Sequence, residues 1–187
     1  MNRGIELERV NLGQFECSSG ELVISDPCYD EGIWCSGVVD ARRGRWLAQV
    51  EVSDEGSWGK RVALLRAMHE DCRDIMPLDP VGFEVGVDSG QAGVFDKSLF
   101  KRASAVPEDF KHHTGAICPD EPWYSYICDH TLREGVGAAV VNGGVVSSSG
   151  FGDGGYVCLV AKQDGDVVAL EIRFITEDDS EDERWDD

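Results

Sequence analysis

Three aspartates lie in short glycine-containing motifs that are typical of tight turns, and their carboxylates are the side chains best suited to chemistry. Asp26 begins an Asp-Pro-Cys-Tyr motif, and Asp88 lies in a Val-Asp-Ser-Gly-Gln motif. Asp153 lies in a third motif, Ser-Gly-Phe-Gly-Asp-Gly-Gly-Tyr. Glycines at this density indicate corners, bulges or close backbone approach. A fold that brings the three turns together would hold the three carboxylates around one cleft, which we take as a hypothesis.

Carboxylates on glycine turns have the chemistry of a hard-cation site. Mg²⁺ and Ca²⁺ prefer oxygen ligands, and Asp26, Asp88, Asp96 and Asp153 could supply them. An ion held in this way would activate water or clamp a phosphate. For any single aspartate the favoured alternative is that it caps its own turn by accepting backbone N–H bonds. The cofactor therefore stays unknown, with a divalent cation as the candidate.

Other side chains near these turns complete the candidate cleft. Cys28 follows Asp26 and could be a nucleophile if a base lay nearby, although a buried thiol is commoner. Phe151 and Tyr156 flank Asp153 as the wall and the polar tip of a pocket, or they belong to the core. The candidate ligand or cleft residues are Asp26, Cys28, Asp88, Gln91, Asp96, Phe151, Asp153 and Tyr156.

A second group of side chains has the types that bind zinc. His112, His113, Cys118, Cys128 and His130 lie close together in the sequence. Their spacing fits no zinc finger, and the last two would point to different faces of a helix. We therefore leave this group out of the predicted site.

The turn motifs also carry a family resemblance. The chain resembles a bacterial and phage family of domains of unknown function, DUF family 4241. The matching segments are 19–29, 58–63, 87–96, 123–131 and 148–156. The resemblance extends over about residues 15–175 and implies a β-rich fold with no assigned activity.

Length and composition favour one folded domain. A chain of 187 residues with 42% hydrophobic content can bury a substantial core. We expect a single β-rich domain over residues 1–176 and an acidic, disordered tail over residues 177–187. No apolar run is long enough to span a bilayer, and the N-terminus has no apolar signal core, so we expect a cytoplasmic protein with no membrane contact. The seven cysteines contain no C-x-x-C pair, which fits reduced thiols.

The net charge of −19 restricts the partners of the protein. An acidic surface repels nucleic acids and anionic membranes, so direct nucleic-acid binding is not expected. It suits a basic protein partner, or mimicry of nucleic acid toward a protein that binds it. The simpler alternative is that the charge serves solubility.

The pattern of residues predicts a β-rich α+β fold built on antiparallel hairpins with one main helix at about 121–133. A hairpin over 156–174 turns at Asp164-Gly165, and a second over 137–149 turns at Asn142-Gly143. Two consecutive hairpins suggest a meander sheet with the third motif at its corner. Further strands are expected at 21–25, 44–53 and 81–88. Residues 60–70 fit either a helix or a strand, and 97–119 fits a loop or short helix.

Three functions remain open from the sequence. The favoured one is a non-enzymatic binding or inhibitory module that acts in bacterial or phage conflict on a protein or small ligand. The second is a metal-dependent hydrolase, or another phosphate-directed enzyme, that uses the clustered aspartates. The third is a structural or assembly protein, in which the motifs serve only folding. The first is favoured because no recognisable catalytic constellation overlies the motifs.

Overall fold

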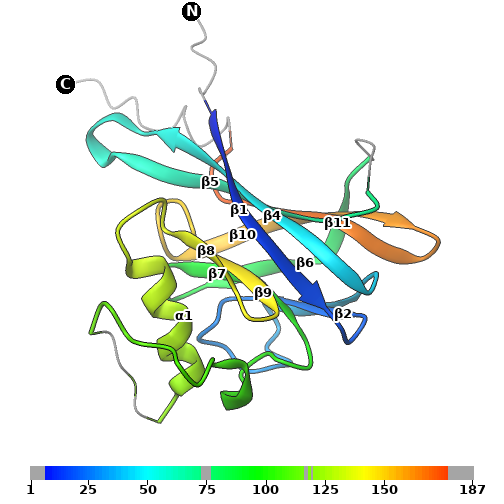
Figure 1. Cartoon of the computed structure of the whole chain (residues 1–187). Coiled ribbons are helices and arrows are strands. Elements are labelled where there is room, and N and C mark those ends of the chain that lie inside the picture. Colours follow the sequence, from blue (N-terminus) through cyan, green and yellow to red (C-terminus); the bar gives the residue numbers. More distant parts are fainter. Residues whose placement is uncertain (1–6, 73–76, 116–117, 119, 177–187) are drawn as a thin grey trace, which may run out of the picture.

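The strands form two antiparallel sheets in the computed structural model, which describes residues 7–72, 77–115, 118 and 120–176 (Figure 1). One sheet has the order β1-β4-β5-β11-β10-β6 and the other β3-β2-β7-β9-β8. The strands are β1 Leu7–Cys17, β2 Glu21–Ser25, β3 Gly37–Asp40, β4 Gly44–Asp54, β5 Lys60–His69, β6 Asp79–Val87, β7 Gln91–Asp96, β8 Ala138–Val141, β9 Gly144–Ser148, β10 Gly154–Gln163 and β11 Asp166–Arg173. With a single α-helix, α1 Pro122–Leu132, in the described part of the chain, the predicted β-rich α+β fold is confirmed. The predicted tail, 177–187, lies outside the described residues.

The main core lies between the two sheets. On β4, Trp46, Ala48 and Val50 are buried and alternate with partly exposed neighbours, as a strand with one face toward the core requires. The segment that fits both helix and strand is a strand, β5. It pairs with β4 on one side and with β11 on the other, so both of its edges are satisfied inside the sheet.

The two predicted hairpins form, but they lie in different sheets. The β10–β11 hairpin turns at Asp164 and Gly165, whose φ angles of 56° and 96° suit a type I′ turn. The β8–β9 hairpin belongs to the five-stranded sheet. The expectation of one continuous meander is therefore wrong, because the third motif carries the chain from one sheet to the other. Gly150 in this crossing has a φ of +59°, and a Cβ there would lie 3.0 Å from Phe174.

The helix α1 packs on the five-stranded sheet, where a second core cluster forms (Figure 1). Its Trp123 ring lies edge-on to Phe95 and Phe100, with centroids 5.2 Å apart in each case. The burial of the helix departs from a simple apolar face, because Leu132 is exposed whereas Asp129 is fully buried. The reason is that residues near 113 cover another side of the helix, and the N–H of His113 donates to the Asp129 carboxylate at 2.7 Å.

A row of charges crosses four strands of the six-stranded sheet. Arg66 on β5 donates from Nε to Glu171 at 2.8 Å and from Nη1 to Glu51 at 3.2 Å. Arg9 on β1 and Arg173 on β11 extend the row by bonding the same two glutamates. Both glutamates are buried, and a buried carboxylate without a positively charged partner lowers the stability of the fold. The arginines of the row supply these partners.

Candidate functional site

The Asp26 carboxylate joins the first motif to the second. It is fully buried at the end of β2. Its Oδ2 accepts hydrogen bonds from the main-chain N–H groups of Asp88 at 2.8 Å and Ser89 at 2.7 Å. Its Oδ1 accepts from the Cys28 N–H at 2.8 Å and the Ser89 hydroxyl at 2.6 Å. Asp26 therefore caps its own turn and, in addition, a turn 62 residues away.

The third motif is attached to the second through the main chain. The N–H of Ser149 donates to the carbonyl oxygen of Gly90 at 3.0 Å. Gly154, at the start of β10, is the register partner of Val87 at the end of β6. All three motif turns consequently adjoin one another, at the junction of the two sheets.

Asp96 performs a similar task for the Ser-Ser-Gly turn after β1. Its Oδ2 accepts from the N–H groups of Ser18 and Ser19, and its Oδ1 accepts from the N–H and hydroxyl of Ser98 at 2.8 and 2.6 Å. Burial favours the neutral acid, but these donors outweigh it and lower the pKa of Asp96 to about 2.

The low pKa of Asp96 predicts a loss of stability in acid. Because the pKa is lower in the folded state, the stabilisation is complete above the ordinary value of 3.8 and is lost as pH falls toward 2. We expect the contribution to be on the order of 2 kcal/mol. Urea unfolding from pH 6 to pH 2 should therefore show a flatter profile for Asp96→Asn than for the wild type. Parallel profiles would contradict this assignment.

Gln91 belongs to a buried polar network between the second motif and α1. Its Oε1 accepts from the Thr131 hydroxyl at 2.5 Å, and its Nε2 lies 3.4 Å from both Ser89 Oγ and Cys128 Sγ. The Tyr124 phenol also bonds Cys128 and Ser89, and its pKa is raised mainly by burial. Gln91 thus positions the second motif against the helix.

Cys28 is held as a neutral thiol. Burial, followed by its hydrogen bond to Asp26 and the charges of Asp26 and Asp88, raises the pKa of Cys28 to about 12. The Lys101 ammonium opposes this shift, but it is itself engaged with the Cys28 carbonyl oxygen at 3.2 Å and with Asp30 at 3.0 Å. Since the thiolate is the nucleophilic form, this geometry favours a structural thiol.

The three motif carboxylates lie in different environments. Asp26 is buried and engaged by four donors, whereas Asp88 and Asp153 are exposed on neighbouring turns. The Tyr29 phenol bonds the Asp88 carboxylate, and this bond is the main cause of the raised pKa of Tyr29. Within the described residues, no group of three or more histidine, cysteine, aspartate or glutamate side chains is arranged to hold a metal ion.

The aromatic residues of the third motif have separate roles. The Tyr156 hydroxyl donates to the carbonyl oxygens of Ser149 at 2.9 Å and Gly152 at 2.7 Å, so it braces the turn from inside. Phe151 is half exposed and lies edge-on to Trp58, with ring centroids 6.2 Å apart. The turn therefore presents one aromatic ring to solvent and uses the other to hold its own backbone.

A further aromatic residue, Trp34, lies on the loop after the first motif with 83% of its surface exposed. The loop is fixed to β6, because the N–H of Gly86 donates to the Cys35 carbonyl oxygen at 2.9 Å. Trp58 is exposed as well. The acidic, glycine-containing segment around Trp34 is the sequence signal for its exposure. We define the motif surface as Tyr29, Asp30, Trp34, Trp58, Asp88, Phe151 and Asp153.

The histidines near α1 form an aromatic cluster. Phe110 stacks on His130 with centroids 5.6 Å apart and lies edge-on to Tyr126 at 4.7 Å. The Nδ1 of His130 lies 2.8 Å from the Tyr126 carbonyl oxygen, and burial lowers the pKa of His130. His113 instead lies beside Asp129, 3.4 Å from its carboxylate.

Comparison with known proteins gives a family but no activity. A family model described as protein of unknown function (DUF4241) matches residues 15–172. No curated protein and no solved structure matches the chain. Over the described part of the chain, no helix is both long enough and apolar enough to cross a membrane.

Proposed function

The chain belongs to the DUF4241 family, and we propose that it is a non-enzymatic binding module that holds a basic segment of a partner protein on the motif surface. One observation carries this proposal. Exposed aromatic rings, Trp34 and Phe151, lie on the same set of interlocked turns as the exposed carboxylates of Asp88 and Asp153. The proposed role as an inhibitor in bacterial or phage conflict and the expected cytoplasmic location are finer parts of the same proposal.

The combination of side chains suits arginine and lysine. A guanidinium group stacks on an exposed indole and at the same time bonds a carboxylate through its N–H groups. Trp34 could take the first contact, while Asp88 and Asp153 could take the second. Tryptophan is also among the residues that contribute most to binding at protein interfaces.

Pre-organisation of the turns strengthens this argument. The buried Asp26 carboxylate and the β6–β10 pairing fix the backbone on which Asp88 and Asp153 lie. A surface that is already ordered loses less conformational entropy when a partner binds. The net charge of −19 adds long-range attraction for a basic partner and repulsion for nucleic acid.

The geometry favours binding over the metal-dependent alternative. A cation bound by Asp26 would compete with the four donors that already engage its carboxylate. The structural alternative predicts that Asp153→Ala lowers thermal stability without changing what is bound. Asp153 is exposed, so we expect the opposite result: unchanged stability and weaker binding.

The proposal is tested with a nine-residue arginine peptide, measured by isothermal titration calorimetry at 150 mM salt. The variant combines Trp34→Ala, Asp88→Asn and Asp153→Asn. The variant loses one cation–π contact and two exposed ion pairs with the peptide, which together contribute on the order of 2 kcal/mol of binding free energy. We therefore expect the affinity for the peptide to fall about tenfold or more.

The control removes the same charge from elsewhere on the surface. Glu16→Gln and Asp164→Asn together neutralise two exposed carboxylates, one near the C-terminal end of β1 and one on the β10–β11 turn. We expect this double variant to bind the peptide within about twofold of the wild type, as removal of distant, screened charges should do. Equal losses in the two variants would show attraction to net charge alone and would contradict the proposal.

A further inference from the structure

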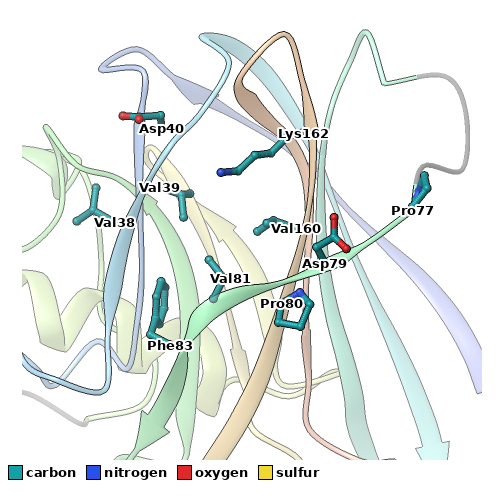
Figure 2. Close-up of a pocket in the computed structure, with 10 residues that line it drawn as sticks. All are labelled: Val38, Val39, Asp40, Pro77, Asp79, Pro80, Val81, Phe83, Val160 and Lys162. Carbon is teal, nitrogen blue, oxygen red and sulfur yellow. The ribbon is translucent and has the colours of Figure 1, made fainter.

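A groove of about 550 Å³ lies between β3 and β6, the strands at one end of each sheet (Figure 2). Its walls include the apolar side chains of Val39 from β3, Val81 and Phe83 from β6, and Val160 from β10. Two acidic residues belong to opposite walls, Asp40 on β3 and Asp79 on β6. Lys162 extends from β10 toward the space between the walls (Figure 2).

The groove is narrow at one end. There the Gly86 N–H donates to the Cys35 carbonyl oxygen, so the loop before β3 contacts β6 directly. The Phe83 ring also lies so close to Gly37 that any side chain at residue 37 would collide with it. Beyond this point β3 and β6 diverge, and the groove begins where their contact ends.

The edge of β3 has main-chain groups directed away from its own sheet. The Glu21 carbonyl oxygen accepts from the Lys97 N–H on the far side of β2, so Glu21 and its partner Asp40 form a non-hydrogen-bonded pair. Antiparallel pairs alternate in type, and Val38 lies two residues from Asp40. The N–H and C=O of Val38 therefore face away from β2, as an added strand requires.

We propose that the groove binds an extended segment of a partner protein, with apolar residues alternating with lysine or arginine. This inference rests on the proposed function and names a second part of the same partner. Alternate apolar side chains would pack on Val39, Val81 and Phe83, and the main chain would pair with Val38. Basic side chains would meet Asp40 and Asp79, the two acidic residues of a lining that contains one lysine, Lys162.

The narrow end of the groove adjoins the motif surface. Trp34 directly precedes Cys35, whose carbonyl oxygen closes the narrow end of the groove against Gly86. A partner that places an arginine on Trp34 can therefore continue as a strand into the groove without leaving the surface. The hydrogen bond between Gly86 and Cys35 joins two main chains, and the incoming strand would make main-chain hydrogen bonds of the same type.

The test uses the full chain and an acetylated nine-residue peptide of alternating valine and lysine. Two peptides serve as controls, one of alternating valine and glutamate and one of alternating glycine and lysine. We expect the first peptide to bind at least tenfold more tightly than either control. Hydrogen exchange should show at least a tenfold slower rate for the Val38 amide when the first peptide is bound.

Matched variants locate the binding. Val38→Lys places a positive charge on the edge of β3, and we expect it to weaken binding of the valine–lysine peptide at least tenfold. Leu7→Lys changes a residue of similar exposure on β1, at the far edge of the six-stranded sheet, and should leave affinity within twofold. Asp40→Asn with Asp79→Asn should weaken binding at least fivefold without altering the fold.

Three results would overturn the groove proposal: equal binding of the valine–glutamate peptide, equal binding to Val38→Lys, or exchange protection away from Val38. If the arginine peptide still binds the motif surface while any of these occurs, the groove proposal is wrong and the proposed function stands. If neither basic peptide binds, both proposals are wrong.

Discussion

Replacing Asp26 with alanine is expected to lower the free energy of unfolding by about 2–4 kcal/mol. The substitution leaves the N–H groups of Cys28, Asp88 and Ser89 without their acceptor in a partly buried position. It also disconnects the first motif from the second. Urea denaturation followed by tryptophan fluorescence measures the change, with the slope of the transition as the check on two-state behaviour.

Asp153→Ala is the matched control, because it removes the same side chain from the third motif. Asp153 is exposed, so we expect the free energy of unfolding to change by no more than about 0.5 kcal/mol. Asp26→Asn keeps one carbonyl oxygen and should lie between the two alanine variants. If Asp26→Ala were as stable as Asp153→Ala, the structural role of the buried carboxylate would be disproved.

Replacing Arg66 with alanine is expected to lower the free energy of unfolding by about 2–4 kcal/mol. The side chains of Arg66, Glu51 and Glu171 are only 17%, 11% and 8% exposed, so water replaces the lost guanidinium poorly. Arg9 and Arg173 remain beside the two glutamates, which is why we do not expect complete unfolding. Thermal and urea unfolding at neutral pH measure the effect.

Two comparisons isolate the cause. Lys60→Ala breaks an exposed pair with Glu8 on the same sheet and should cost at most about 1 kcal/mol. Neutralising both glutamates in an Arg66→Met background, with Glu51→Gln and Glu171→Gln, should recover much of the stability lost in Arg66→Met alone. A triple variant less stable than Arg66→Met would show that packing, and not the unpaired charges, causes the loss.

The sequence predicted the elements whose signals are local. The strand at residues 21–25 matches β2, the main helix at 121–133 contains α1, and both hairpin turns lie where their Asp-Gly and Asn-Gly pairs indicate. Each of these signals depends on neighbouring residues and is independent of the partner strand. Local signals could not predict that the two hairpins belong to different sheets, because sheet membership depends on pairing with strands that are distant in the sequence.

Three strands were not predicted, each for a local reason. β1 is an edge strand with a register shift next to Gly13, so polar residues and a bulge obscure its alternation. β3 has only four residues. β7 is buried throughout and contains Gly93, where a Cβ would lie 2.7 Å from the Val145 carbonyl oxygen. That glycine, which resembles a turn signal in the sequence, marks close approach of two strands.

The motif aspartates could be selected from the sequence, whereas the contacts that they make could not. The sequence identified Asp26, Asp88 and Asp153, and turn capping was the favoured alternative for each. It could not show that Asp26 binds amides 62 residues away, because no local pattern encodes that contact. Nor could it separate exposed from buried tryptophans, since Trp34 and Trp46 are equally apolar and differ only in the tertiary surroundings.

The most direct test of the proposed binding surface is a ¹H–¹⁵N NMR titration of the full chain with the nine-residue arginine peptide at 150 mM salt. We predict saturable shifts concentrated at the Trp34 indole N–H and at the amides of Asp88, Phe151 and Asp153. Residues at the other end of β1, such as Glu16, and on the β10–β11 turn, such as Asp164, should shift little. Shifts spread evenly over all acidic segments, or saturable shifts that bypass the motif surface, would contradict the account.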